Sequence, residues 1–240
     1  MKVARKVTGV VISSKDHKEK DKLISLFTVE EGLVYASMRG VRGDKAKMKS
    51  AKEVFCFGEY VLENTKGNNV VTQVEIIDNF YGLTKDIDKY YEASSMLDII
   101  NKIATPQANP QLFIDFLKGL RGICYQNIKK IYILDKFLIS MFKNLGYEFV
   151  TEKCSSCGAK LSERKYFNLD IGEIVCPACK NDCCVPINET CFSALKLLNN
   201  TDFEKLSTLN LTAGSEVECL KLLDKNFEWR FGKRFSSPIV

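Results

Sequence analysis

Short apolar runs separated by polar turns fill the first eighty residues of the chain. In the fifth run, Val70, Val74 and Ile76 fall on one face, and Gln73 and Glu75 fall on the other. Apolar residues at every second position are typical of a strand with one buried face. Five strands in about eighty residues predict a small barrel, or an SH3-like or OB-like sheet.

The apolar spacing changes to three and four residues after residue 80, which is the period of an α-helix. The last helical segment begins at Ser215 and has Glu218 three residues later, the pattern of a capping box. Five segments are predicted as helices: 88–104, 111–126, 129–147, 189–200 and 215–231. The two patterns together predict an α+β protein with a β domain over 1–80 and a mostly helical domain over 81–240.

A cysteine-rich segment at about 151–187 interrupts the helical part. Cys154 and Cys157 are two residues apart, eighteen residues follow, and Cys176 and Cys179 repeat the pair. This spacing is typical of a zinc ribbon or knuckle, in which two turns offer four thiolates to one tetrahedral ion. Four protein ligands leave no open position, so we predict one structural Zn²⁺ ion. Two nearby residues are alternatives to the last ligand: Cys183 and Cys184.

Neither a signal peptide nor a run of about twenty apolar residues occurs in the sequence, which predicts a cytoplasmic protein without a membrane partner. In a reducing cytosol, paired cysteines are more often metal ligands or catalytic thiols than disulfides. A thioredoxin-like dithiol would need a neighbouring βαβ unit, and the pattern predicts none. The remaining cysteines lie in apolar patterns and are predicted core residues: Cys56, Cys124, Cys191 and Cys219.

Positive charge is concentrated in residues 36–52, whose net charge of +5 equals that of the whole chain. A local positive field predicts a polyanionic partner such as nucleic acid, while a solvated loop is the alternative. Nearby aromatic side chains could stack on bases or fill the barrel core: Tyr35, Phe55, Phe57 and Tyr60.

Enzyme motifs are missing from the sequence: it has no P-loop, no H-E-x-x-H and no G-x-S-x-G. The single histidine, His17, lies in a charged turn. We therefore predict a binding protein rather than an enzyme. A zinc-ribbon RNA-binding or transcription-associated OB protein is the main alternative, and a metal-dependent hydrolase is a further one.

The order of these parts resembles the bacterial RecO family of DNA repair and recombination mediators. The stretches that carry the resemblance are 9–12, 19–23, "LFTVEEGLV", "MRGVRGDKAKMK", "FEWRF" and a short serine-containing C-terminal tail. The cysteine quartet resembles that of the zinc-bearing members. The resemblance covers essentially the whole chain.

The resemblance implies that residues 1–80 form a five-stranded OB-fold barrel that contacts single-stranded DNA. It also implies a protein of the bacterial cytoplasm that binds single- and double-stranded DNA and anneals complementary strands. The implied partners are RecR, the C-terminal tail of single-strand-binding protein and, indirectly, RecA. Arg39 and Arg42 are the most direct candidates for DNA contact, followed by Lys45, Lys47 and Lys49.

Overall fold

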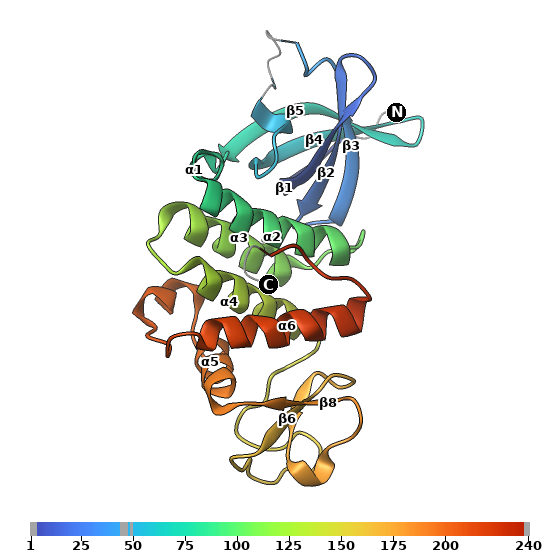
Figure 1. Ribbon diagram of the computed structural model, residues 1–240. Helices are drawn as coiled ribbons and strands as arrows, with labels where there is room; N and C mark the ends of the chain where they lie inside the picture. The colour runs from blue at the N-terminus through green and yellow to red at the C-terminus, as the bar shows by residue number, and fades with distance from the viewer. Residues whose placement is uncertain (1–3, 44–47, 49, 238–240) are drawn as a thin grey trace. The chain divides into compact units, whose positions relative to one another are not determined.

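The computed structural model describes residues 4–43, 48 and 50–237, and contacts group the chain into two compact units (Figure 1). The first unit runs to Asp86 and also includes Leu97–Ile114. The second includes Ile87–Met96 and the residues from Asp115 onward. Each unit therefore combines two segments that are separate in the sequence. The division into domains at 1–80 and 81–240 stays a prediction, because compactness alone does not show which segment folds independently.

The first unit contains a closed five-stranded barrel in the order β1-β2-β3-β5-β4, as the alternating pattern predicts. All neighbouring strands are antiparallel except β3 and β5, which are parallel. The strands are β1 (Ala4–His17), β2 (Asp21–Thr28), β3 (Gly32–Met38), β4 (Phe57–Thr65) and β5 (Asn68–Asp78). The long β1 pairs with both β2 and β4, and this double pairing closes the barrel without an open edge on either side of β1.

A bulge in β5 changes which side chains of this strand face the barrel core. Val61 pairs with Gln73 and Leu62 pairs with Val71, so Thr72 has no opposite residue. An extra residue shifts the alternation of side chains by one position. The buried Val71 therefore joins the barrel core, against which Val74 also packs. The prediction that Val70, Val74 and Ile76 share one buried face is wrong: Val70 pairs with Glu63 on the opposite face from Val74. Ile76 keeps the register of Val74 but is 39% exposed.

Helices account for most of the second unit, as the three- and four-residue spacing predicts. The helices of the chain are α1 (Tyr81–Lys85), α2 (Ile87–Ile103), α3 (Pro110–Tyr125), α4 (Lys130–Asn144), α5 (Glu189–Asn199) and α6 (Ser215–Phe231). Eleven residues of α4 are buried, and α4 contacts both α5 and α6. A helix that is buried on most of its circumference lies at the centre of its unit.

The first turn of α6 differs from its prediction. The helix begins at Ser215, but the N-cap residue is Gly214 in a left-handed conformation. The Ser215 hydroxyl is buried and has no hydrogen-bond partner among the described residues, and Glu218 pairs instead with Lys221 at 3.2 Å. The predicted capping box is therefore not formed, because Ser215 lies inside the helix rather than at its N-cap position.

A small antiparallel sheet in the order β7-β6-β8 supports the cysteine segment. Its strands are β6 (Lys165–Asn168), β7 (Glu173–Val175) and β8 (Cys184–Ile187). Arg230 of α6 donates hydrogen bonds to the carbonyls of Leu169 and Asp170 at 3.2 and 3.3 Å. The Arg230 guanidinium also lies 3.7 Å from the centre of the Tyr147 ring. The Trp229 indole of α6 donates to Asp170 Oδ1 at 3.2 Å as well, so two α6 side chains fasten the small sheet to the helical core.

Every helix within the described ranges is too short or too polar to cross a lipid bilayer.

Candidate metal centre and nucleic-acid interface

Two tight turns present the four paired cysteines. In the first, the Gly158 amide donates to the Cys154 carbonyl at 2.8 Å, and Gly158 has a left-handed φ of 73°. Glycine adopts this conformation without a steric penalty. In the second turn, which contains a 3₁₀ helix over Pro177–Cys179, the Cys179 amide donates to the Cys176 carbonyl at 3.1 Å. Each turn therefore directs two thiols to the same side.

The four sulfur atoms of Cys154, Cys157, Cys176 and Cys179 all lie within 4.8 Å of one another. The Sγ atoms of Cys157 and Cys176 are 3.8 Å apart. A tetrahedral zinc ion with Zn–S bonds of about 2.3 Å would hold its sulfur ligands about 3.8 Å apart. The spacing between the sulfurs thus fits a closed four-thiolate site, and the cluster could bind a metal ion.

Backbone amides favour the thiolate form of Cys154, the form that binds metals. Burial by itself raises the pKa of this thiol, and amide donors from Cys176, Cys157 and Ser156 oppose it. Together the amides outweigh burial and bring the pKa of Cys154 down to about 6. One of them, the Cys176 amide, lies 3.3 Å from the Cys154 sulfur. Donors fixed by the fold therefore prepare this sulfur for a cation.

The two alternative ligands are outside this cluster. The Cys184 thiol donates to Asn181 Oδ1 at 3.1 Å, and a hydrogen bond to Asp170 raises the pKa of Cys183. Throughout 4–43, 48 and 50–237, the quartet is the only group of three or more histidine, cysteine or acidic side chains close enough to hold a metal. The symmetric pairing of Cys176 with Cys179 is thus the one that the fold assembles.

The basic run begins directly after β3, and its first part lies against the β1–β2 turn. Arg42 pairs with Asp16 at 3.0 Å and donates to the carbonyls of Lys18 and Lys20, the latter through its backbone amide. The Gly40 amide donates to Asp21 at 2.9 Å. Two segments about twenty residues apart in the sequence are therefore neighbours. The three predicted contact residues Lys45, Lys47 and Lys49 lie outside the described residues.

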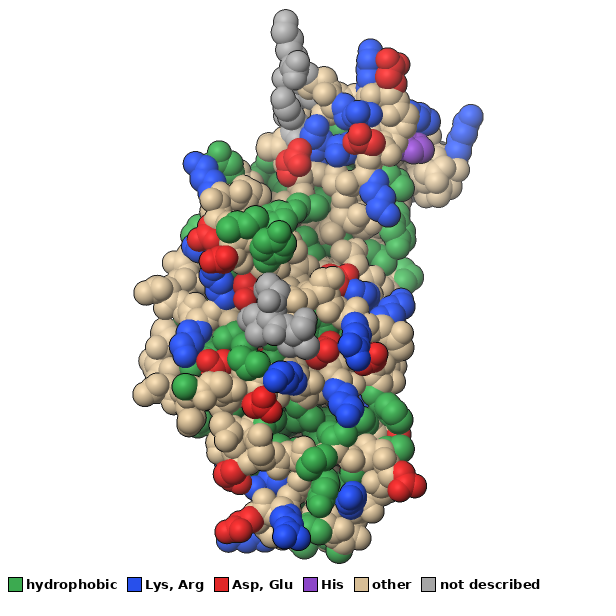
Figure 2. Space-filling view, viewed as in Figure 1, with side chains coloured by type: hydrophobic (Ala, Val, Ile, Leu, Met, Phe, Trp, Pro, Cys, Tyr) green, Lys and Arg blue, Asp and Glu red, His purple; other side chains and the backbone are tan. Residues whose placement is uncertain are grey.

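Basic side chains of both segments are exposed at this end of the barrel, and Figure 2 shows Lys and Arg gathered over the first unit. Arg39 is exposed, and none of the described residues pairs with its guanidinium. Lys15 near the end of β1 and Lys18 and Lys20 of the β1–β2 turn are exposed as well. The sequence identifies this segment only as a charged turn, and the loop positions of an OB barrel are the pattern that could indicate an interface there.

Lys52, the last residue of the basic run, has a structural role instead. Its side chain is buried, and its ammonium donates to the Val41 carbonyl at 2.9 Å. Because this charge is withdrawn from the surface, it cannot contact a phosphate chain without local rearrangement.

The structure separates the four aromatic residues that the sequence left undecided. Phe55 and Tyr60 are fully buried, and the half-buried Phe57 packs against Phe113 with ring centres 6.2 Å apart. Tyr35, on the outer face of β3, is 59% exposed. Strands 2 and 3 form the usual ligand face of an OB barrel, and exposed rings there can stack on bases. Tyr35 alone among the four is placed for such contact.

An OB-like barrel with a basic end, followed in the chain by helices and a four-cysteine cluster, defines the class: an α+β OB-fold protein with a metal-binding cysteine group. The family model described as "Recombination protein O N terminal" matches residues 1–80. The model described as "Recombination protein O C terminal" matches residues 84–238. The chain belongs to the RecO family of DNA repair proteins, which confirms the resemblance of its sequence.

Relatives named DNA repair protein RecO match most of the chain. One from Clostridium novyi is 30% identical over 230 residues, which cover 95% of this chain and 90% of the relative. One from Clostridium perfringens is 30% identical over 215 residues, covering 89% and 87%. One from Desulfitobacterium hafniense is 27% identical over 242 residues, covering 94% and 88%. Both predicted parts of the chain therefore have counterparts in these relatives.

Proposed function

We propose that this protein is a non-enzymatic recombination mediator that binds single- and double-stranded DNA and anneals complementary strands. In this proposal it acts with RecR to help load RecA onto DNA coated by single-strand-binding protein. The observation that carries the proposal is the basic end of the barrel, where the residues after β3 meet the β1–β2 turn. Membership of a DNA repair family supports the same role.

Charge at this end of the barrel suits a phosphate chain. Residues 15–22 together with residues 39 and 42 include six basic and three acidic side chains. One of the acids, Asp16, is already paired with Lys22 and Arg42, at 3.1 and 3.0 Å. Lys and Arg contacts of this kind give affinity that depends on salt and little on sequence, as a protein that anneals any complementary strands requires. Lys45, Lys47 and Lys49, which follow Arg42 in the sequence, are part of the same proposal.

The double variant Arg39→Glu/Arg42→Glu is expected to bind single-stranded DNA at least about tenfold more weakly and to anneal strands more slowly. Two phosphate contacts are lost, so the slope of log K against log salt should decrease by about 0.7 for each contact. Fluorescence anisotropy over a range of salt concentrations measures the affinity and the slope, and a quenching assay with complementary oligonucleotides measures annealing.

A matched control reverses two exposed lysines of α6, in Lys221→Glu/Lys225→Glu, which changes the net charge equally. Equal losses in both double variants would contradict an interface at the barrel. A competition between DNA and RNA strands of equal length tests the alternative, since strong RNA preference would favour the RNA-binding or transcription-associated protein.

We propose that the four cysteines hold one structural zinc ion. The proposal rests on their mutual spacing and on the amide donors around Cys154. With four thiolates bound, the ion has no position for water or substrate, so its contribution would be to fold the segment around it.

A groove of about 350 Å³ in the second unit is our candidate for the tail of single-strand-binding protein. Its walls combine apolar and basic side chains from α3, α4 and the segment 203–206, including Lys118, Arg121, Tyr125, Ile133 and Phe203. Lys118 pairs with Glu204 at 2.8 Å, whereas Arg121 is exposed and pairs with none of the described residues. The apolar floor of the groove and the exposed Arg121 guanidinium together complement a tail that is both acidic and apolar.

Arg121→Glu is expected to weaken binding of a labelled peptide with the tail sequence at least about tenfold, because an attractive charge becomes repulsive. Anisotropy titrations measure the affinity, and Lys221→Glu on α6 provides the matched control. Unchanged affinity in Arg121→Glu would place the tail elsewhere on the protein.

A further inference from the structure

Acidic side chains lie among the basic ones at the proposed DNA-binding end of the barrel, as Figure 2 shows over the first unit. Asp16, near the end of β1, is one of them, and its side chain is 57% exposed. A carboxylate repels a phosphate chain, so its presence at such an interface requires an explanation. The contacts that Asp16 makes within the barrel provide one.

Asp16 connects β1 to β2 and to the segment after β3. It lies opposite Lys22 in the β1–β2 pairing, and one of its oxygens pairs with the Lys22 ammonium at 3.1 Å. Its other oxygen pairs with Arg42, which follows β3, at 3.0 Å. The hydrogen bond from Lys22, together with the charges of Arg42 and Lys22, lowers the pKa of Asp16. Asp16 is therefore ionised at neutral pH, where both pairs can form.

Both the backbone and the side chain of Arg42 are held in place. Val41, the residue before it, is buried in the barrel core, and the Arg42 amide donates to the Lys20 carbonyl at 3.2 Å. The guanidinium donates through Nη1 to the Lys18 carbonyl at 3.2 Å, and its Nη2 pairs with Asp16. A guanidinium has five N–H groups, so donors remain for a phosphate after these two contacts.

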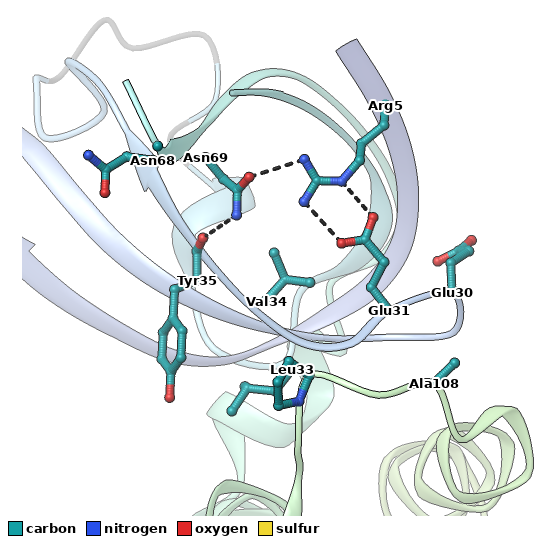
Figure 3. Close-up of a pocket in the computed structure, with 11 residues that line it drawn as sticks. Arg5, Glu30, Glu31, Leu33, Val34, Tyr35, Asn68, Asn69 and Ala108 are labelled. Carbon is teal, nitrogen blue, oxygen red and sulfur yellow. Dashed lines mark hydrogen bonds and ion pairs between the residues drawn. The ribbon is translucent and has the colours of Figure 1, made fainter. Parts of the chain in front are cut away.

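The barrel contains two more arginines, and their surroundings differ from those of Arg42. Arg5 lines the opening where β3 and β5, which pair at only two positions, separate. Its guanidinium pairs with both carboxylate oxygens of Glu31, at 2.5 and 3.0 Å, and donates to Asn69 Oδ1 at 3.1 Å (Figure 3). Glu31 therefore neutralises Arg5, whereas Arg39 is exposed and pairs with none of the described residues. Of the three, only Arg42 combines a fixed side chain with donors that remain available.

We infer that Asp16 is a positioning residue for DNA binding, which orients the Arg42 guanidinium so that its remaining donors meet a phosphate. This inference rests on the proposed function, because it requires a DNA chain at this end of the barrel. An arginine that is ordered before binding loses less entropy when it contacts a phosphate. That gain outweighs the repulsion from Asp16, because its two partners neutralise the carboxylate and salt screens the charge that remains.

The test is the direction in which the affinity changes when the charge of Asp16 is removed. Asp16→Asn should weaken binding of single-stranded DNA about fivefold, because Arg42 loses its orientation. The slope of log K against log salt should decrease by up to about 0.7, the share of one phosphate contact. Charge alone predicts the opposite result, since the variant removes a repulsion and releases Lys22 and Arg42 from their partner. Anisotropy titrations over a range of salt concentrations measure both quantities.

Glu19→Gln is the matched control, because Glu19 is exposed in the β1–β2 turn and pairs with none of the described residues. It removes the same charge without disturbing Arg42, so it should strengthen binding about twofold and leave the salt slope unchanged. If Asp16→Asn binds DNA as tightly as the wild type or more tightly, while Arg39→Glu/Arg42→Glu loses affinity, the inference is overturned and the proposed function stands.

A double-mutant cycle shows whether Asp16 acts through Arg42. In the Arg42→Gln background, Asp16→Asn should strengthen binding about twofold, as Glu19→Gln does, because no guanidinium remains to be oriented. Weaker binding in that background would overturn the inference, because Asp16 would then support the β1–β2 hairpin itself. If Asp16→Asn, Arg42→Gln and Arg39→Glu/Arg42→Glu all bind DNA as the wild type does, the proposed interface and the inference fail together. Thermal unfolding of each variant checks that the barrel remains folded.

Discussion

Cys154→Ser is expected to abolish stoichiometric metal binding and to unfold the segment around the cysteine cluster. A serine hydroxyl cannot replace a thiolate as a zinc ligand near neutral pH, and structural zinc sites contribute about 10–16 kcal/mol of binding free energy that is available only to the folded segment. The apolar core beside the cluster is small, with only Cys154, Val175 and Cys176 buried in it. The small sheet still buries Phe167 and Ile174, so the loss of order should be greatest in the two cysteine turns, which the metal holds together.

Two measurements test this expectation. Metal analysis of the wild type should give about one zinc ion per chain and Cys154→Ser a small fraction of that. Limited proteolysis should cut the variant within residues 151–187 much faster than the wild type. Cys183→Ser is the matched control, because Cys183 lies in the same segment but outside the cluster. Absence of zinc from wild-type protein purified without chelators would refute the metal site, and loss of zinc in Cys183→Ser would refute this set of ligands.

Glu92→Gln is expected to stabilise the protein by about 3 kcal/mol at pH 8 and far less at pH 4.5. Glu92 of α2 is 5% exposed, and its Oε2 has no hydrogen-bond partner among the described residues. Burial raises its pKa to about 7, with Lys130 opposing the shift and Asp88 adding to it. Below the unfolded-state pKa of 4.5, Glu92 is neutral in both states and costs little. As the pH rises toward 7 and above, ionisation of the buried carboxyl progressively destabilises the folded state.

Another buried carboxyl of the same unit, on α4, shares this penalty. Asp135 in the middle of α4 is fully buried, and neither of its oxygens has a hydrogen-bond partner in the described structure. Burial, followed by the charges of Glu216 and Glu92, raises the pKa of Asp135 well above its usual range. Glu216 pairs with Lys129 through one oxygen at 3.5 Å, while the other has no partner among the described residues. Neutralising Glu92 therefore also removes a repulsion from Asp135.

Urea unfolding of wild type and variant at pH 4.5 and pH 8 measures the expected difference. Lower pH also weakens metal binding by thiolates, but that effect is common to both proteins and cancels in their difference. Glu218→Gln on α6 is the control, because its exposed carboxylate pairs with Lys221 and should contribute less than about 1 kcal/mol. A stabilisation by Glu92→Gln that is the same at both pH values would show that a change in packing, not ionisation, is its cause.

Local patterns in the sequence predicted the elements well, because each depends on a few neighbouring residues. Five strands and the main helices follow from the period of apolar positions, and the two cysteine turns follow from the short C-x₂-C spacing. The predictions were wrong where the outcome depends on a shift of one residue along a strand or helix. The bulge at Thr72 places Val71 instead of Val70 on the core face with Val74. The start of α6 one residue after Gly214 deprives Ser215 of its capping role. Backbone geometry determines such shifts, and the period of apolar side chains in the sequence does not reveal that geometry.

The candidate interface was less predictable than the cysteine cluster for a physical reason. Arg39 and Arg42 were found because basic residues are dense around them in the sequence. The lysines of the β1–β2 turn join them only because two hairpins bring Lys18 and Lys20 against Arg42. Tyr35 could not be separated from Phe55 and Tyr60 without knowing which strand faces point outward.

By itself, the sequence determined the α+β plan, the family and the four cysteines that could share one metal ion. Each of these depends on residue types at short, fixed separations, which chain geometry converts into local structure. The tertiary structure alone decided that Tyr35 is exposed, that Lys52 is buried and that β3 separates from β5 to leave an opening beside Arg5 and Asn69. Closure of the barrel fixes these features, because it brings together residues that are 11 to 64 positions apart.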